Sequence, residues 1–225
     1  MPTTRITPVT AESLATATRA LARKDEDLRR IYKAHGVPPM WARRPGFATL
    51  LQIIIEQQVS LTSARSMVKR LTTNIEPFTP ERFIELNEPH LRSLGLTRQK
   101  SHYCVQLAHA FIEGRLDKIG RMSDEEAHSA LVSVKGIGTW SANVYLLMAL
   151  KRPDIWPNGD VALATAVGKL MQRPVRPSFI ELEKIADAWR PFRSVAARML
   201  WHYYLQRSLP EWTKTLQGVS VKGAS

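Results

Sequence analysis

Hydrophobic residues along the chain recur at intervals of three and four positions, which is the spacing of an amphipathic α-helix. No segment between turn signals alternates β-branched and polar residues as a half-buried strand does. The pattern therefore predicts an all-α fold. Helices are expected over residues 11–23, 25–35, 47–58, 61–73, 80–86, 88–94, 98–113, 123–133, 139–150, 161–171, 178–188 and 191–206.

Several of these helices carry their own start signals. Ser123 with Glu126 and Ser178 with Glu181 have the spacing of a capping box, in which each side chain bonds the other residue's backbone N–H. Thr79 precedes a proline, which is tolerated in the first helical turn. These signals predict where three of the helices begin.

The stretch ATLLQIIIEQQV, residues 48–59, is apolar on nearly all faces until it reaches Glu56, Gln57 and Gln58. A helix that is apolar all round is buried, so this segment is expected to form a central core helix with a polar end. A structural hydrogen-bonding role is expected for Gln57 and Gln58.

Charge narrows the class of partner. The 225 residues include 32 Lys and Arg against 20 Asp and Glu, a formal net charge of +12. This balance is typical of nucleic-acid binders, although membrane-surface and ribosomal proteins share it. No apolar run reaches the length of a membrane helix and the N-terminus lacks a signal-peptide core. A cytoplasmic protein without a membrane partner is expected, associated with the nucleoid if the source is bacterial.

The single cysteine, Cys104, excludes an internal disulfide, a four-thiolate zinc site and a four-cysteine iron–sulfur cluster. The six histidines show no spacing that specifies a metal, so none is assigned as a ligand.

Two helical patterns within residues 123–150 are joined only by Lys135, Gly136, Ile137 and Gly138. Such a short connection needs residues that tolerate positive φ, which glycines supply. Glycines also leave the backbone N–H groups of the turn and of the helix beginning at Thr139 open to an anion, and the helix dipole favours negative charge there. A DNA phosphate would fit this site; the alternative is an ordinary tight helix–helix turn.

Asp160 ends a loop of Pro, Asn and Gly residues and precedes a new helix near Val161. The simplest role for an aspartate there is a helix cap. The alternative is catalytic, since a fixed carboxylate near a sugar stabilises the oxocarbenium character that develops when an N-glycosidic bond breaks, and it can orient or deprotonate water.

Four segments together resemble the helix-hairpin-helix (HhH-GPD) DNA glycosylase superfamily, and within it the alkylpurine, or 3-methyladenine DNA glycosylase II, branch. They are IIIEQQVSLTSA (53–64), LRSLGLTRQKSHYCVQLAHAF (91–111), the block 131–160 and WRPFRSVAARMLW (189–201). The resemblance implies a two-lobed fold with its active site in the cleft between the lobes. It further implies a central lobe of residues 41–169 and a terminal lobe of residues 1–40 and 170–225.

The resemblance also implies roles for individual residues. Asp160 would be the catalytic carboxylate, and Trp140, Trp201 and Gln58 would line the pocket for an extruded base. An indole face attracts a cationic methylated purine, although either tryptophan could instead be a core residue. Contacts with DNA would come from Lys135, Gly136, Ile137, Gly138 and Thr139 of the hairpin and from Thr97, Arg98 and Gln99.

The loop around Arg98 corresponds to the family's wedge, which fills the gap left by the extruded base. A well-known bacterial relative has leucine where Arg98 aligns, so either Arg98 or Leu96 could insert.

Departures from the family pattern define the expected subclass. Bifunctional members place a Schiff-base lysine where this chain has Trp140, so no lyase activity is expected. The chain resembles a compact form without the N-terminal β domain of some alkylpurine enzymes. No cofactor is expected to be required, and in relatives hairpin carbonyls such as those near Val132 and Val134 can hold a structural monovalent cation.

These features predict a monomeric, monofunctional glycosylase of base excision repair. It would flip alkylated bases of the 3-methyladenine and 7-methylguanine type out of double-stranded DNA and hydrolyse them, leaving an abasic site. The alternative is a non-catalytic helix-hairpin-helix module that binds damaged DNA. Sequence does not rank the alkylated and deaminated bases as substrates.

Overall fold

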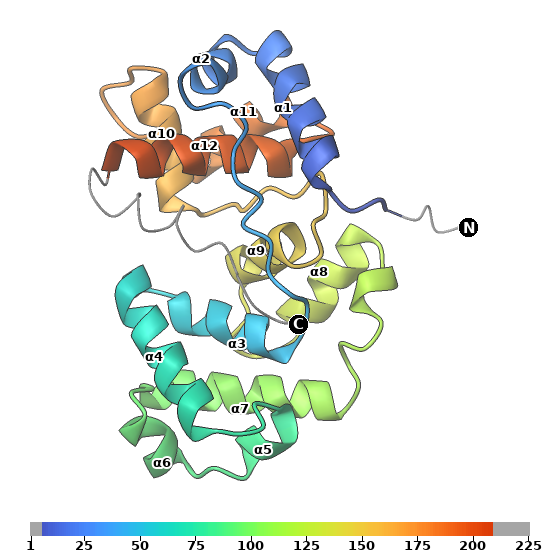
Figure 1. The fold of residues 1–225 in the computed structure, drawn as a ribbon, viewed down its shortest axis with the longest axis vertical. Helices are drawn as coiled ribbons and strands as arrows, with labels where there is room; N and C mark the ends of the chain where they lie inside the picture. The colour runs from blue at the N-terminus through green and yellow to red at the C-terminus, as the bar shows by residue number, and fades with distance from the viewer. Residues whose placement is uncertain (1–5, 209–225) are drawn as a thin grey trace, which may run out of the picture. The chain divides into compact units, whose positions relative to one another are not determined.

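The computed structural model describes residues 6–208, and these form helices joined by loops, without a strand (Figure 1). The expected all-α class is confirmed. Within the same residues no helix is both long and apolar enough to cross a membrane.

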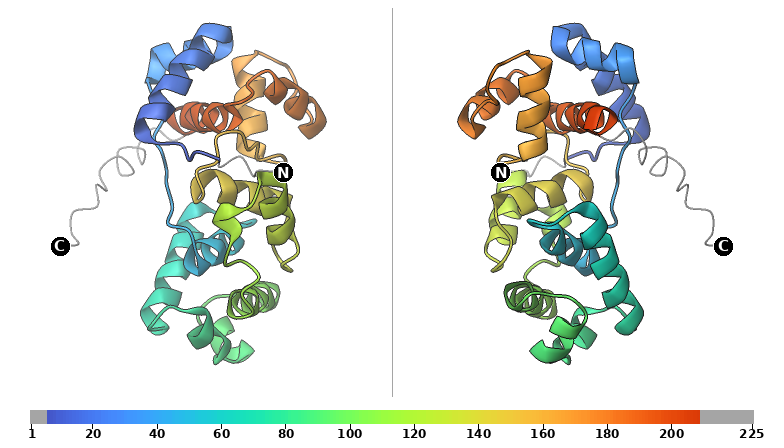
Figure 2. Two further views of the ribbon diagram at one scale, coloured as in Figure 1. Left: turned by 90° about the vertical axis from the view of Figure 1, so that its right-hand side faces the viewer. Right: turned by 90° about the vertical axis from the view of Figure 1, so that its left-hand side faces the viewer.

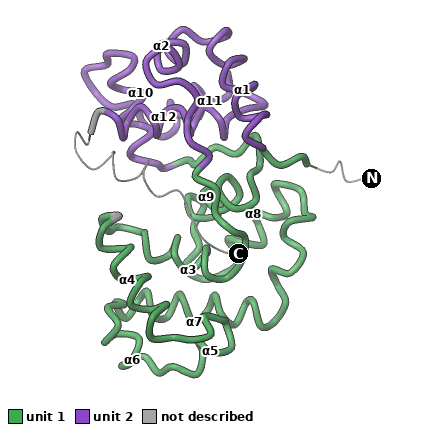
Figure 3. Tube along the Cα trace, in the orientation of Figure 1, with its two compact units in different colours: residues 1–9, 41–158 green, residues 10–40, 159–225 purple. Residues whose placement is uncertain are grey.

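The chain divides into two compact units (Figure 3). Unit 1 comprises residues 1–9 and 41–158, and unit 2 comprises residues 10–40 and 159–225. The helices of unit 1 are α3 (Phe47–Glu56), α4 (Leu61–Asn74), α5 (Pro80–Ile84), α6 (Glu88–Ser93), α7 (Arg98–Ile112), the 3-10 turn η1 (Ile119–Arg121), α8 (Asp124–Val132) and α9 (Thr139–Met148). Those of unit 2 are α1 (Ala11–Lys24), α2 (Glu26–His35), α10 (Val161–Leu170), α11 (Phe179–Asp187) and α12 (Arg193–Ser208).

Helix α3 forms the core of unit 1, as its uniform hydrophobicity predicts. Its residues Leu50, Leu51 and Ile53 are all 1% exposed or less. It packs against α4, α7 and α9. Helix α7 in turn lies between α3 and the short helices α5 and α6 (Figures 1 and 2).

Helix α12 occupies the middle of unit 2, with α1 and α2 on one side and α10 and α11 on the other (Figure 2). The charged residue Arg198, near the middle of α12, is fully buried. The Arg198 guanidinium donates from Nε to the Met40 carbonyl at 2.9 Å and from Nη1 to the Ser194 carbonyl at 3.2 Å. Burial lowers the pKa of Arg198 to about 10.

The predicted helix starts are confirmed at Thr79, Ser123 and Ser178, and both capping boxes are present. The prediction for α3 was two residues too long. Gln57 is extended and Gln58 has a φ of +58°, so the chain turns away after Glu56. The turn η1 was not predicted, because a single 3-10 turn has too few residues to show a period.

The two units divide differently from the lobes expected from the sequence. Helix α10 falls in unit 2 because it packs against α12 and α11. Residues 6–9 fall in unit 1, where the Val9 N–H donates to the Lys151 carbonyl at 2.8 Å.

Candidate functional site

The hairpin between α8 and α9 is a tight turn stabilised by its own backbone. The Val134 N–H donates to the Leu131 carbonyl at 3.1 Å, and the Ile137 N–H donates to the Val134 carbonyl at 3.0 Å. Ile137 is buried, which anchors the tip of the turn, whereas Lys135 and Thr139 are exposed. The turn thus presents a cationic side chain and a helix N-terminus to solvent.

The two glycines of the hairpin have different structural roles. Gly136 has a φ of +99°, and a Cβ there would lie 2.4 Å from Cγ of the Tyr103 ring. Gly138 has a φ of −87° and open space where a Cβ would be. Gly138 is the N-cap of α9 and provides no side-chain bond to that helix's N–H groups. Gly136 therefore serves the turn and its packing, while Gly138 leaves the helix N-terminus accessible.

The polar end of α3 reaches the hairpin through Gln57. Its Nε2 donates to the Gly136 carbonyl at 3.0 Å and to Ser141 Oγ at 2.9 Å. The structural role considered for Gln57 is thereby confirmed. Gln58 is exposed, and its left-handed backbone points the chain in a new direction.

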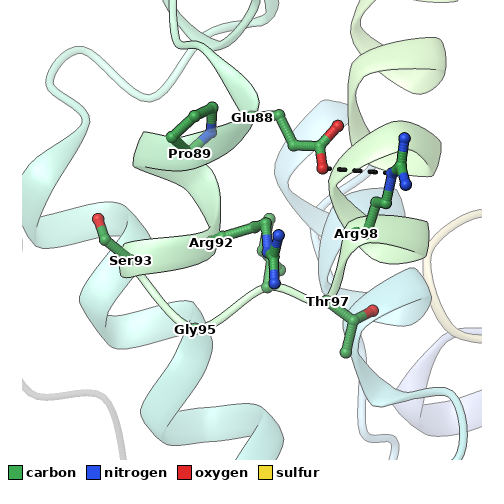
Figure 4. Close-up of a pocket in the computed structure, with 8 residues that line it drawn as sticks. Glu88, Pro89, Arg92, Ser93, Gly95, Thr97 and Arg98 are labelled. Atoms are coloured by element: carbon green, nitrogen blue, oxygen red, sulfur yellow. Dashed lines mark ion pairs between the residues drawn. The ribbon is translucent and has the colours of Figure 1, made fainter.

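The loop before α7 separates the two candidate wedge residues by exposure. Leu96 is 3% exposed and packs into unit 1, whereas the Arg98 side chain is 84% exposed. Arg98 Nε lies 3.5 Å from Glu88 Oε1 of α6, across a shallow surface hollow of about 720 Å³ (Figure 4). Of the two side chains, only that of Arg98 projects from the surface.

The first turn of α7 holds the other two residues expected to contact DNA at this loop. Thr97 is the N-cap of α7, its Oγ1 accepting the Lys100 N–H at 3.2 Å. Gln99 is exposed, and its Nε2 donates to the Tyr103 hydroxyl at 2.8 Å. Both residues are accessible while their side chains stabilise the start of the helix.

Lys100 does not point into solvent with its neighbours. Its Nζ donates to the carbonyls of Ile55 at 2.6 Å and Gln57 at 2.8 Å. These carbonyls belong to the end of α3, where unsatisfied acceptors and the helix dipole both favour a cation. Burial lowers the pKa of the Lys100 amine.

Trp140, the second residue of α9, is half-buried beside the hairpin. The loop that follows α9 is hydrogen-bonded to this helix, because Asn143 Nδ2 donates to the Trp156 carbonyl at 2.9 Å. The buried Arg152 anchors the start of this loop: its Nη2 donates to the Met122 carbonyl at 2.8 Å, and its Nε lies 3.4 Å from Asp124 Oδ1. These contacts restrain the chain that leads to Asp160.

Asp160 caps α10, as the simplest interpretation of the sequence predicts. Its Oδ1 accepts the Leu163 N–H at 2.9 Å, and the residue is 7% exposed. The carboxylate is therefore held at the N-terminus of α10.

Trp201 lies on α12 in unit 2 and is 9% exposed. The next residue, His202, is also buried, with Gln206 Nε2 3.3 Å from its Nε2 and the His35 ring 5.7 Å away between centroids. The pKa of His202 is lowered, chiefly by burial and further by His35.

The site residues expected from the sequence are thus distributed over both units. The hairpin, Trp140, Gln58 and residues 97–99 belong to unit 1, and Asp160 and Trp201 belong to unit 2. Sequence reasoning missed Lys100, Tyr103 and Asn143. Each acts through a partner distant in sequence, and their residue types are common on helix surfaces, so no local signal identifies them.

The described residues contain no group of three or more His, Cys, Asp or Glu side chains that could hold a metal ion. Cys104 is fully buried in α7, and burial raises the pKa of its thiol to about 12.

Comparison with known proteins connects this geometry to a family. The family model described as "HhH-GPD superfamily base excision DNA repair protein" matches residues 51–191, which include the hairpin, Asp160 and Trp140.

Curated relatives carry consistent names. The chain is 26% identical over 184 residues to the putative DNA-3-methyladenine glycosylase YfjP of Bacillus subtilis, covering 76% of this chain and 63% of that protein. It is 25% identical over 214 residues to DNA-3-methyladenine glycosylase 1 of Schizosaccharomyces pombe, covering 91% of this chain and 92% of that protein.

The fold is shared with a solved structure of the Schizosaccharomyces pombe 3-methyladenine DNA glycosylase Mag1 in complex with abasic DNA. The TM-score is 0.74 at 24% identity, over 87% of this chain and 98% of that one. The hairpin built on Gly136 and Gly138, the helical fold around it and the match over residues 51–191 agree: the chain belongs to the HhH-GPD superfamily of base excision DNA repair proteins.

Proposed function

We propose that the protein is a monofunctional DNA glycosylase that removes alkylated bases from double-stranded DNA by hydrolysis and leaves an abasic site. The observation that carries this proposal is the carboxylate of Asp160, which is fixed at a helix N-terminus by its bond to the Leu163 N–H. The match to the superfamily and the names of the relatives support the same activity.

In this proposal Asp160 acts on the sugar. Cleavage of the N-glycosidic bond leaves positive charge on the deoxyribose, and a carboxylate held in place stabilises that charge without reorganising. The same group can orient or deprotonate the attacking water. Because an alkylated purine is already cationic, it departs without a strong acid, and one carboxylate is sufficient.

In this proposal Trp140, Trp201 and Gln58 contact the extruded base. An indole face attracts a cationic methylated purine by about 0.5–2 kcal/mol. This preference favours bases of the 3-methyladenine and 7-methylguanine type over neutral damaged bases.

DNA would be bound at two places in unit 1. The N–H groups around Gly138 and Thr139, together with Lys135, would bind a backbone phosphate. Arg98 would insert into the gap left by the base, since its side chain is exposed and Leu96 is not. Thr97 and Gln99 flank Arg98 and would contact the DNA beside it.

No lyase step is proposed, because Trp140 stands where bifunctional members have the lysine that forms a Schiff base. We also propose that the hairpin holds a structural monovalent cation. The Val134 carbonyl already accepts one N–H and has a second lone pair for such an ion. We further propose that the protein acts as a monomer and, in a bacterial source, is associated with the nucleoid.

The test is release of bases from methylated duplex DNA, with the products separated by chromatography. The wild-type protein should release 3-methyladenine or 7-methylguanine, and Asp160→Asn should lose this release while still binding DNA that holds an abasic analogue. Asparagine caps helices as well as aspartate does, so this substitution removes the charge and retains the fold. Undiminished release by Asp160→Asn would refute the mechanism, and a wild-type protein without any release would refute the function.

A further inference from the structure

The hairpin is linked to residues 96–99, which include the start of α7, by a set of contacts that have no role in the proposed function. Gln57 lies at the centre of this set. Its side chain donates both of its N–H groups, one to the Gly136 carbonyl and one to Ser141 Oγ. Its own carbonyl accepts from Lys100 Nζ at 2.8 Å. One residue therefore contacts the hairpin, the first turn of α9 and the first turn of α7.

A second path joins the same two segments. The Tyr103 ring fills the place where a side chain at position 136 would lie, and its hydroxyl accepts from Gln99 Nε2 at 2.8 Å. Tyr103 thereby contacts the hairpin with its ring and Gln99, in the first turn of α7, with its hydroxyl.

These contacts are well defined physically. The Gly136 carbonyl can only accept, so the Gln57 amide must present its N–H groups to the hairpin. Ser141 is 2% exposed and Gln57 is half-buried, so losing the Gln57 donors would leave acceptors without compensation from bulk water. Lys100 binds two carbonyls at the end of α3, which fixes the backbone of Gln57 as well as its side chain.

We propose that Gln57 is a positioning residue, and that Gln57, Lys100 and Tyr103 form a brace that holds the hairpin and residues 96–99 as one body. The inference rests on the proposed function, in which the hairpin binds a phosphate and Arg98 enters the base stack. The brace fixes the distance between the phosphate site at the hairpin and Arg98. The brace is needed when the hairpin binds a phosphate and Arg98 is inserted into distorted DNA at the same time. It is not needed when undamaged duplex is bound through phosphates alone.

The central variant is Gln57→Met, which keeps the length of the side chain and removes its donors. Its matched control is Gln52→Met. Gln52 lies on α3, is likewise half-buried and donates to Glu56 Oε1 of the same helix at 2.8 Å. Lys100→Met is a second variant that breaks the brace from the α7 side.

Three measurements test the brace: the single-turnover rate of base release, the dissociation constants for duplexes with and without an abasic analogue, and hydrogen exchange of the amides of residues 135–139. For Gln57→Met we expect release to slow by about tenfold to 100-fold, the scale associated with small misplacements in an active site. Binding of the abasic analogue should weaken, binding of undamaged duplex should stay near wild type, and hairpin exchange should accelerate. Gln52→Met should match the wild type in all three.

Release and abasic-analogue binding equal to those of Gln52→Met would overturn the inference. Equal losses of affinity for the two duplexes would also overturn the inference, because Gln57 would then support only the phosphate contact at the hairpin. If Gln57→Met does not fold, Lys100→Met decides by the same criteria. Failure of the proposed function is a separate outcome, recognised by the absence of release from the wild-type protein, and hairpin exchange still reports on the brace in that case.

Discussion

Gly136 packs directly against Tyr103, so closely that a Cβ at position 136 would lie 2.4 Å from Cγ of the ring. Gly138, two residues later, faces open space. Spacing alone gives both glycines the same role in a short turn. The structure assigns one to packing within unit 1 and the other to access at the N-terminus of α9.

Substituting the two glycines should therefore give different results. Gly136→Ala meets both the Tyr103 ring and a φ of +99°, and we expect it to lower the free energy of unfolding by about 1–3 kcal/mol. Gly138→Ala should cost less than about 1 kcal/mol, while its methyl group obstructs an anion at the helix N-terminus and weakens DNA binding. Urea unfolding and titration with duplex DNA measure the two effects. Equal losses of stability would contradict this division of roles.

Asp160 should show two separable contributions. Asp160→Ala removes the cap on Leu163 and should reduce the free energy of unfolding by about 1 kcal/mol, within a range of about 0.5–2. Asp160→Asn keeps an acceptor and should be close to wild type in urea unfolding. An equal loss of stability in both variants would mean that the charge, and not the cap, stabilises α10.

Lys135 should contribute to DNA affinity through its charge. It is exposed on the hairpin, and a lysine that neutralises one phosphate releases about one condensed counterion. Lys135→Ala should weaken binding to all duplex sequences and reduce the slope of log affinity against log salt by about one. Affinities measured over a salt series give this slope. A slope identical to that of the wild-type protein would exclude Lys135 from the phosphate contact.

His202 should make the stability of unit 2 dependent on pH. Burial and the neighbouring His35 hold the pKa of His202 below its ordinary value of 6.5, so the unfolded chain binds a proton that the folded chain resists. This stability is complete above the unfolded pKa and is lost as the pH falls below it. Urea unfolding from about pH 8 down to about pH 5 should show a decline that His202→Gln reduces. A decline of the same size in the variant would assign it to other groups.

The fold class and several local features of this protein could be predicted from residues that lie close together in the sequence. The all-α class, the capping boxes at Ser123 and Ser178, the buried helix α3 and the turn at Gly136 and Gly138 all depend on neighbours a few residues apart. Such short-range features leave a readable period or a characteristic pair in the sequence. The family resemblance rests on the same local motifs, and the match over residues 51–191 confirms it.

Other features depend on packing between segments that are distant along the chain. Gln57 and Gly136 are 79 residues apart, and nothing near either residue indicates that they meet. Burial likewise distinguishes Leu96 from Arg98, two residues of one loop that the sequence leaves equivalent. Side-chain partners and exposure are properties of the assembled core, so the brace and the exposed arginine became apparent only once α3, α7 and the hairpin were placed together, whereas the cap at Asp160 could be predicted from its own loop.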